Sequence, residues 1–107
     1  MSILQGTTPS LEGAFDKADF LVGDVVTLEL TISNNERLLY KSLNDVDVDA
    51  EANSFIYHFS EAETLALNTK VPLVYQWRFV FEDGNVVGTE KESIEVVDLM
   101  SDRELTT

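Results

Sequence analysis

Three aspartates in alternation, Asp45, Asp47 and Asp49, are the arrangement in this sequence that could bind a hard cation. Alternate side chains of an extended segment lie on one face, so these carboxylates would point the same way. Calcium needs about six to eight oxygen ligands from a loop that wraps around it, and an EF-hand loop starting at Asp45 would lack its required glycine and glutamate. We favour a solvated edge whose like charges block strand pairing, with a calcium site as the alternative.

The sequence offers little for catalysis. Nucleophilic catalysis needs a Ser, Thr or Cys beside a base that a third group orients, and the chain has one histidine, His58, and no cysteine. His58 alternates with Tyr57 and Phe59, so we expect it to point away from the aromatic face. No zinc ligand set and no Gly-rich phosphate loop are visible. We predict no catalytic residues and no cofactor, with a hydrolase using two carboxylates as the enzymatic alternative.

Aromatic side chains could instead form a platform on which sugar rings stack. The candidates are Trp77, Tyr75 and Tyr40. Trp77 and Tyr75 share an alternating stripe with Leu73 and Phe79, so core packing is the favoured interpretation for both. Tyr40 lies outside that stripe, and its role stays open.

The strongest structural pattern is the alternation of apolar and other residues over 71–81, which predicts a strand with one core-facing side. The segment Glu82-Asp83-Gly84-Asn85 follows it and supplies residues that tolerate positive φ, as a tight hairpin requires. The chain is expected to return over 86–97, and Gly88 could mark a bulge in that return strand.

Further strands and turns follow from the same reasoning. A strand near the start of the chain contains Pro9, which places it at a sheet edge. In a second strand the predicted core-facing set is Val26, Leu28, Leu30 and Ile32. The predicted strands are 7–15, 26–33, 37–42 and 54–59, and the predicted turns are 34–36 and 44–53.

One segment has the pattern of a helix. Ser60 and Glu63 form a capping box before an apolar stretch, and so short a helix must pack Leu65 or Leu67 on a sheet. These elements predict an all-β fold, an immunoglobulin-like two-sheet antiparallel β-sandwich of about seven strands with one short helix. We expect one domain over 1–98 and an acidic, flexible tail over 99–107.

The charge of the chain excludes some partners. Seven basic and twenty acidic residues give a formal charge of −13, which repels phosphate backbones and anionic lipids. We therefore expect no nucleic-acid and no membrane partner. No signal-peptide pattern is visible at the N-terminus, so we expect synthesis in the cytoplasm.

Three stretches together resemble a family of small acidic proteins of phages and prophages, similar to the N-terminal domain of upper baseplate proteins. They are 5–11 (Gln-Gly-Thr-Thr-Pro-Ser-Leu), 60–65 (Ser-Glu-Ala-Glu-Thr-Leu), and 76–79 (Gln-Trp-Arg-Phe) followed by Asp83-Gly84-Asn85. The chain departs from the family at Trp77, where an aliphatic residue is usual, and over 16–24. The resemblance implies a β-sandwich that is synthesised in the bacterial cytoplasm and has a virion-associated structural role, without catalytic residues.

The leading hypothesis is therefore a non-enzymatic phage or prophage structural protein of the tail or baseplate region. An edge strand can accept a strand of a partner, so the partner-binding candidates are Ile3, Leu4, Thr7, Thr8 and Leu11. The expected partners are other virion proteins or a second copy of this chain. The alternatives are a carbohydrate- or receptor-binding module and a small acidic protein that interacts with the host.

Overall fold

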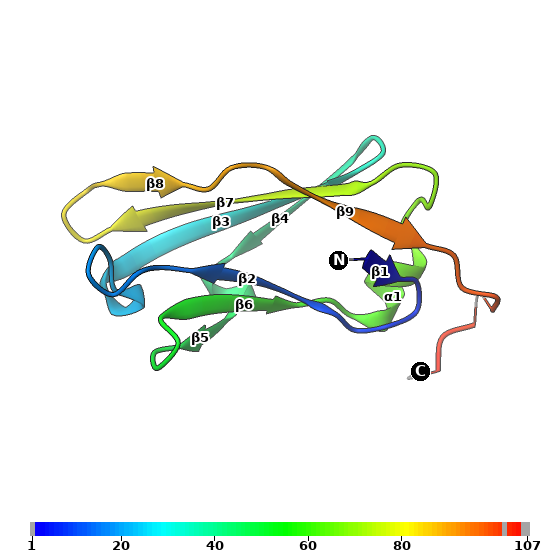
Figure 1. The fold of residues 1–107 in the computed structure, drawn as a ribbon, viewed down its shortest axis with the longest axis horizontal. Helices are drawn as coiled ribbons and strands as arrows, with labels where there is room; N and C mark the ends of the chain where they lie inside the picture. Colours follow the sequence, from blue (N-terminus) through cyan, green and yellow to red (C-terminus); the bar gives the residue numbers. More distant parts are fainter. Residues whose placement is uncertain (1, 102, 106–107) are drawn as a thin grey trace.

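Two β-sheets face each other in the computed structural model, which describes residues 2–101 and 103–105 (Figure 1). The larger sheet has the order β1-β9-β7-β3-β4, with β8 paired to β7. Its strands are β1 (Ser2–Leu4), β3 (Val25–Asn34), β4 (Arg37–Ser42), β7 (Leu73–Phe81), β8 (Val86–Gly88) and β9 (Glu92–Val97). The smaller sheet has the order β2-β6-β5 and consists of β2 (Ser10–Ala14), β5 (Asp47–Asp49) and β6 (Ser54–His58). The predicted two-sheet sandwich is confirmed.

The described residues form nine strands, where about seven were expected. The strand β5 lies within 44–53, which was predicted to be a turn, and β1 was not predicted as a strand. Both have three residues, too few for a period of two to be recognised. The sheet is also not wholly antiparallel, because β1 runs parallel to β9, with Ile3 opposite Val96.

The strand β7 follows the predicted alternation. Its buried residues are Leu73, Trp77, Phe79 and Phe81, and Tyr75 is half-buried. The rings of Trp77 and Phe79 stack with their centroids 5.7 Å apart and their planes 8° apart. The prediction that Trp77 belongs to the core is confirmed.

The strand β3 differs from its predicted alternation at one end. Leu28, Leu30 and Ile32 are buried as expected, but Val26 is exposed and Val25 is buried instead. The pairing with β7 shifts register between Val25 and Thr27, as a β-bulge does, and this reverses which side chain faces the core. The prediction for Val26 is therefore wrong.

The hairpin that connects β7 and β8 forms where the sequence predicts it. Gly84 has φ +86°, and the backbone N–H of Phe81 donates a hydrogen bond to Asn85 O at 2.9 Å. Gly88 is the last residue of β8, where a bulge was expected. The N–H of Thr89 still bonds Trp77 O at 2.9 Å, and the chain rejoins β7 only at Glu92, opposite Tyr75.

Asn53 fixes the loop 15–24 against the smaller sheet. Its Oδ1 accepts a hydrogen bond from the N–H of Val22 at 2.9 Å, at the start of the 3₁₀ turn η1 (Val22–Asp24). Its Nδ2 donates to Phe20 O at 2.7 Å and to Phe15 O at 3.1 Å. One buried amide thus satisfies three backbone groups that the loop leaves unpaired.

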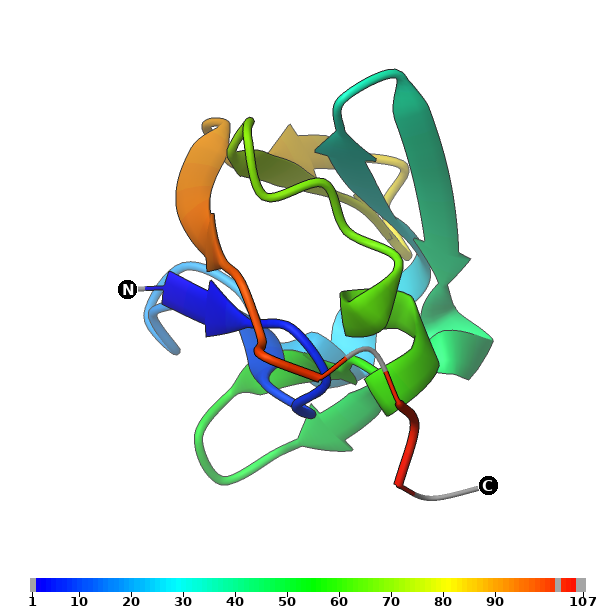
Figure 2. The ribbon, with the colours of Figure 1, turned by 90° about the vertical axis from the view of Figure 1, so that its right-hand side faces the viewer.

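The helix α1 (Glu61–Leu65) lies at the end of the sandwich that also holds β1 (Figure 1 and Figure 2). The predicted capping box is present, because Ser60 Oγ accepts from the N–H of Glu63 and the Glu63 carboxylate accepts from the N–H of Ser60. Leu67 packs against the core, as expected. Thr64 is fully buried and donates its hydroxyl hydrogen bond to Thr7 O at 2.7 Å, which ties the helix to the N-terminal segment.

The described part of the predicted tail contacts the domain at two points. The N–H of Leu99 donates to Gln5 Oε1 at 3.3 Å, and the N–H of Leu105 donates to Glu61 Oε2 at 2.7 Å. The flexibility of the tail stays a prediction. Across the described residues, no helix combines the length and apolar character needed to cross a membrane.

Candidate binding surfaces

The residues predicted to bind a partner divide between the core and the surface. Leu4, Thr7 and Thr8 are exposed, whereas Ile3 and Leu11 are buried. Successive residues of a strand face opposite sides, and Ile3 and Leu11 both face the core of the sandwich. What remains accessible is the outward side of β1 and the loop after it.

A surface that we name the β1 edge consists of Leu4, Thr7, Thr8 and Val97. Leu4 and Val97 are opposite each other in the parallel pair β1–β9, with exposed fractions of 41% and 37%. The strand β1 ends the order of the larger sheet, so no described strand pairs with its far side. An uncharged strand edge and an apolar pair therefore lie together at the surface.

The calcium candidates do not share one environment. Asp45 belongs to the 3₁₀ turn η2 (Leu43–Asp45), where its Oδ2 accepts hydrogen bonds from the N–H of Ser42 at 2.8 Å and from its hydroxyl at 3.2 Å. The backbone hydrogen bond from Ser42 lowers the pKa of Asp45. This carboxylate caps a turn, so the expected alternation of 45, 47 and 49 on one strand face is wrong at its first member.

The other two aspartates also have local roles. Asp47 Oδ2 lies 3.0 Å from Nε2 of His58, which is exposed as predicted, and Asp49 accepts a hydrogen bond from the N–H of Ala52 at 3.0 Å. Nowhere in 2–101 or 103–105 do three or more His, Asp or Glu side chains come together as metal ligands. The structure therefore gives the solvated-edge interpretation more support than the calcium site.

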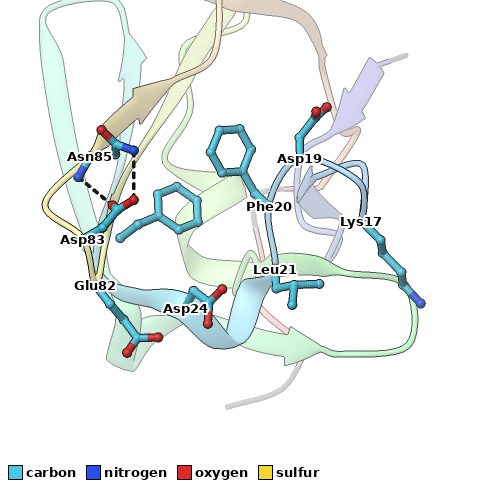
Figure 3. A pocket seen from close by; sticks show the side chains of 9 residues that line it. Lys17, Asp19, Phe20, Leu21, Asp24, Glu82, Asp83 and Asn85 are labelled. Atoms are coloured by element: carbon cyan, nitrogen blue, oxygen red, sulfur yellow. Dashed lines mark hydrogen bonds between the residues drawn. The ribbon is translucent and has the colours of Figure 1, made fainter.

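A hollow that we name the end hollow lies between the loop 17–24 and the β7–β8 hairpin, with a volume of about 710 Å³ (Figure 3). Phe20 and Phe81 stack beneath it, with ring centroids 4.8 Å apart. Its lining residues are Lys17, Asp19, Phe20, Leu21, Asp24, Phe81, Glu82, Asp83 and Asn85. The four carboxylates are all exposed, so the hollow has a negative field without the buried ligands that would fix an ion.

Two carboxylates of the end hollow interact directly. The hydrogen bond to Asp24 and the negative charge of Asp24 raise the pKa of Glu82, and Asp83 adds to the repulsion. Sequence reasoning did not single out this hollow. Asp24 and Glu82 are far apart in the chain, and the pairing of Val25 with Phe81 and the hydrogen bond from the N–H of Glu82 to Asp24 O at 2.9 Å bring them together.

A third surface, which we name the tyrosine face, lies on the outer side of the larger sheet. It consists of Tyr40, Thr31, Gln76, Glu29 and Arg78. Thr31 is paired with Tyr40 on one side and with Gln76 on the other, and Glu29 is paired with Arg78 in the next row. Arg78 Nη2 lies 3.1 Å from Glu29 Oε1. Tyr40 is 60% exposed and therefore, unlike the buried Trp77, does not belong to the core.

A polar cluster joins the two sheets near α1. The Tyr57 hydroxyl donates to the Glu63 carboxylate at 2.6 Å, and Lys41 Nζ lies 3.1 Å from Glu63 Oε2. Burial and the hydrogen bond to Glu63 raise the pKa of Tyr57 to about 12. Burial alone would raise the pKa of Glu63, but hydrogen bonds from Ser60, Tyr57 and Lys41 lower it. The Glu63 carboxylate thus connects Tyr57 of β6 and Lys41 of β4 to the helix α1.

Comparisons with known proteins do not identify a family. No family model matches the chain, and no curated protein matches it significantly. The resemblance to phage baseplate proteins therefore stays a prediction, and the functional argument depends on the surfaces described above.

Proposed function

We propose that this chain is a non-enzymatic structural protein of a phage or prophage particle and that it acts through protein–protein contacts at the β1 edge. The observation that carries the proposal is the exposed Leu4–Val97 pair beside an unpaired strand edge. A partner strand can add its backbone hydrogen bonds to such an edge while its side chains cover the apolar pair.

Charge distinguishes this edge from two others. The strand β1 carries no charged residue, whereas β5 carries Asp47 and Asp49 and β4 carries Arg37 and Lys41. Charged side chains at a strand edge discourage pairing with another chain. A standard interface needs about 800 Å² from each partner, so a docked protein would also cover Thr7 and Thr8.

The virion role is supported by the resemblance of the three sequence stretches and by the sandwich fold that the resemblance implies. The exposed Leu4–Val97 pair gives such a role an apolar contact surface.

The test is incorporation into particles. Tagged forms of the wild-type chain, of Leu4→Lys and of Leu21→Lys would be expressed in the bacterium that carries the gene, and purified particles would be analysed by mass spectrometry. Leu21 is 48% exposed at the opposite end of the sandwich, so its variant is the matched control. We expect the wild type and Leu21→Lys in the particles and Leu4→Lys lost from them.

Two results would contradict the proposal separately. Absence of the wild-type chain from the particles excludes the virion role. Incorporation of Leu4→Lys at the wild-type level excludes the β1 edge as the docking surface. Circular dichroism of the purified variants shows whether each is folded. We expect both to fold, because both substitutions are at exposed positions.

A further inference from the structure

The tyrosine face contains a shallow hollow that the proposed docking at the β1 edge does not use. Its volume is about 230 Å³, and its lining residues are Glu29, Thr31, Gln76, Trp77, Arg78 and Gly88. Typical pockets for drug-sized ligands have about 300–1,000 Å³. The hollow is therefore of a size for one small ring.

The hollow exists because the strand next to β7 is interrupted. The strand β8 ends at Gly88 and β9 begins at Glu92, so the middle of β7 has no strand partner on that side. Gly88 is opposite Arg78 and has no side chain to fill the space. The larger sheet thus has a gap in its outer surface beside two polar residues of β7, Gln76 and Arg78.

The polar groups around the hollow are held in place by one another. Glu29 Oε1 lies 3.1 Å from Arg78 Nη2 and accepts from Thr31 Oγ1 at 3.4 Å. Gln76 Nε2 donates to Thr89 O at 2.8 Å, while its Oε1 accepts no hydrogen bond from the described residues. A carboxylate, a guanidinium and an amide oxygen are thus presented together, and the two charges cancel locally.

Tyr40 does not line the hollow itself, but it adds an aromatic surface on the same face of the sheet, next to the lining residue Thr31. It is a cross-strand neighbour of Thr31 on the same face, and it lies on the edge strand β4, where its ring is 60% exposed. An exposed tyrosine offers an apolar ring face and a polar hydroxyl, which suits a ligand with an apolar face and a polar rim. A pyranose ring has this character, because its C–H groups form flat faces and its hydroxyls project at the edges.

We propose that the tyrosine face binds one neutral sugar residue, a hexose or N-acetylhexosamine, with the ring against Tyr40 and the hydroxyls toward Gln76, Arg78 and Glu29. A neutral ligand fits the cancelled charges of the hollow, and an anionic sugar is repelled by the net charge of −13. This binding is independent of the virion role and of the β1 edge.

The experiment is a titration of the ¹⁵N-labelled full chain, followed by amide chemical shifts, with four soluble probes. These are methyl α-D-glucopyranoside, methyl β-D-galactopyranoside, methyl N-acetyl-β-D-glucosaminide and, as the anionic control, methyl β-D-glucuronide. We expect at least one neutral glycoside to shift amides of Thr31, Gln76 and Arg78 with an affinity on the order of millimolar, as a ligand of this size allows. The glucuronide should cause no such shifts.

Two variants remove the site in different ways. Tyr40→Ala deletes the aromatic surface and should weaken binding about tenfold. Gly88→Leu fills the hollow, and it should fold because a Cβ there meets only Trp77 O, at an ordinary 3.7 Å. Leu38→Ala is the matched control, since Leu38 is 55% exposed on the same face of β4, and it should bind like the wild type.

The proposal fails if none of the three neutral glycosides shifts these amides, or if the shifts occur at the end hollow instead. It also fails if Tyr40→Ala and Gly88→Leu bind as well as Leu38→Ala does. Equal binding of the glucuronide would exclude a site that is selective for neutral sugars.

Discussion

The two ends of the sandwich are held together by different interactions. At the end with the termini, Glu63 accepts hydrogen bonds from Ser60 and Tyr57 and pairs with Lys41, so its charge is compensated. At the hairpin end, aromatic rings pack below a group of exposed carboxylates that repel one another. A glutamate carboxylate is therefore stabilised by its neighbours at one end of the sandwich and repelled by them at the other.

The pKa shifts of two glutamates express this difference. Hydrogen bonds lower the pKa of Glu63 in spite of its burial, whereas the neighbouring Asp24 raises the pKa of the exposed Glu82. Folding thus favours the charged form of one carboxylate and the protonated form of the other. The carboxylates that give the chain its formal charge of −13 therefore do not all affect stability in the same direction.

The largest effect should come from removing an aromatic ring at the hairpin end. Phe81 is buried and contacts the rings of Phe15 and Phe20, with centroids 5.7 Å and 4.8 Å away. Phe81→Ala should lower the free energy of unfolding by about 3 kcal/mol, since it leaves a cavity under the loop. Urea denaturation followed by circular dichroism measures the loss. Val86→Ala, an exposed control in the adjacent strand, should change it by less than about 0.5 kcal/mol.

Equal losses for the two variants would show that the rings at this end are not what stabilises it. The end hollow would then have no aromatic support, and the contrast between the two ends would disappear.

A smaller effect is expected at the opposite end. Glu63→Ala removes the capping box and the partners of Tyr57 and Lys41, and we expect a loss of about 2 kcal/mol at neutral pH. Because the folded pKa of Glu63 is lowered, its stabilisation is present above the ordinary carboxyl pKa and is lost as the pH falls through the folded value. The difference from wild type should therefore shrink in acid. Glu95→Ala, at an exposed position of β9, is the control, and a deficit that stays constant with pH would contradict the role of the charge.

The sequence predicts a strand correctly where the alternation extends over enough residues that one exception does not obscure it. The strand β7 has nine residues, so its alternation is long enough to be recognised. Gly84 marks the turn that follows it. The three-residue strands β1 and β5 contain no such pattern. The shift between Val25 and Thr27 depends on pairing with β7, which a single strand's sequence does not encode.

The surfaces were harder to predict because they combine residues from different strands. Ile3 and Leu4 are neighbours on one strand and face opposite sides, so Ile3 is buried and Leu4 is exposed. Tyr40 was recognised as a candidate aromatic, but its polar neighbours Thr31 and Gln76 follow only from the register of β4, β3 and β7.

The smallest predicted effect concerns the carboxylates of the end hollow. Glu82→Gln removes a charge that Asp24 and Asp83 repel, so it should raise the melting temperature slightly at neutral pH. The folded pKa of Glu82 is raised, so the folded state binds its proton more tightly, and wild-type stability falls as the pH rises from the ordinary value through the raised one. The advantage of Glu82→Gln should consequently be largest above that window and vanish below it. Thermal unfolding over a pH series tests this, and an advantage that grows toward acid would mean that Glu82 is stabilised by its neighbours, as Glu63 is.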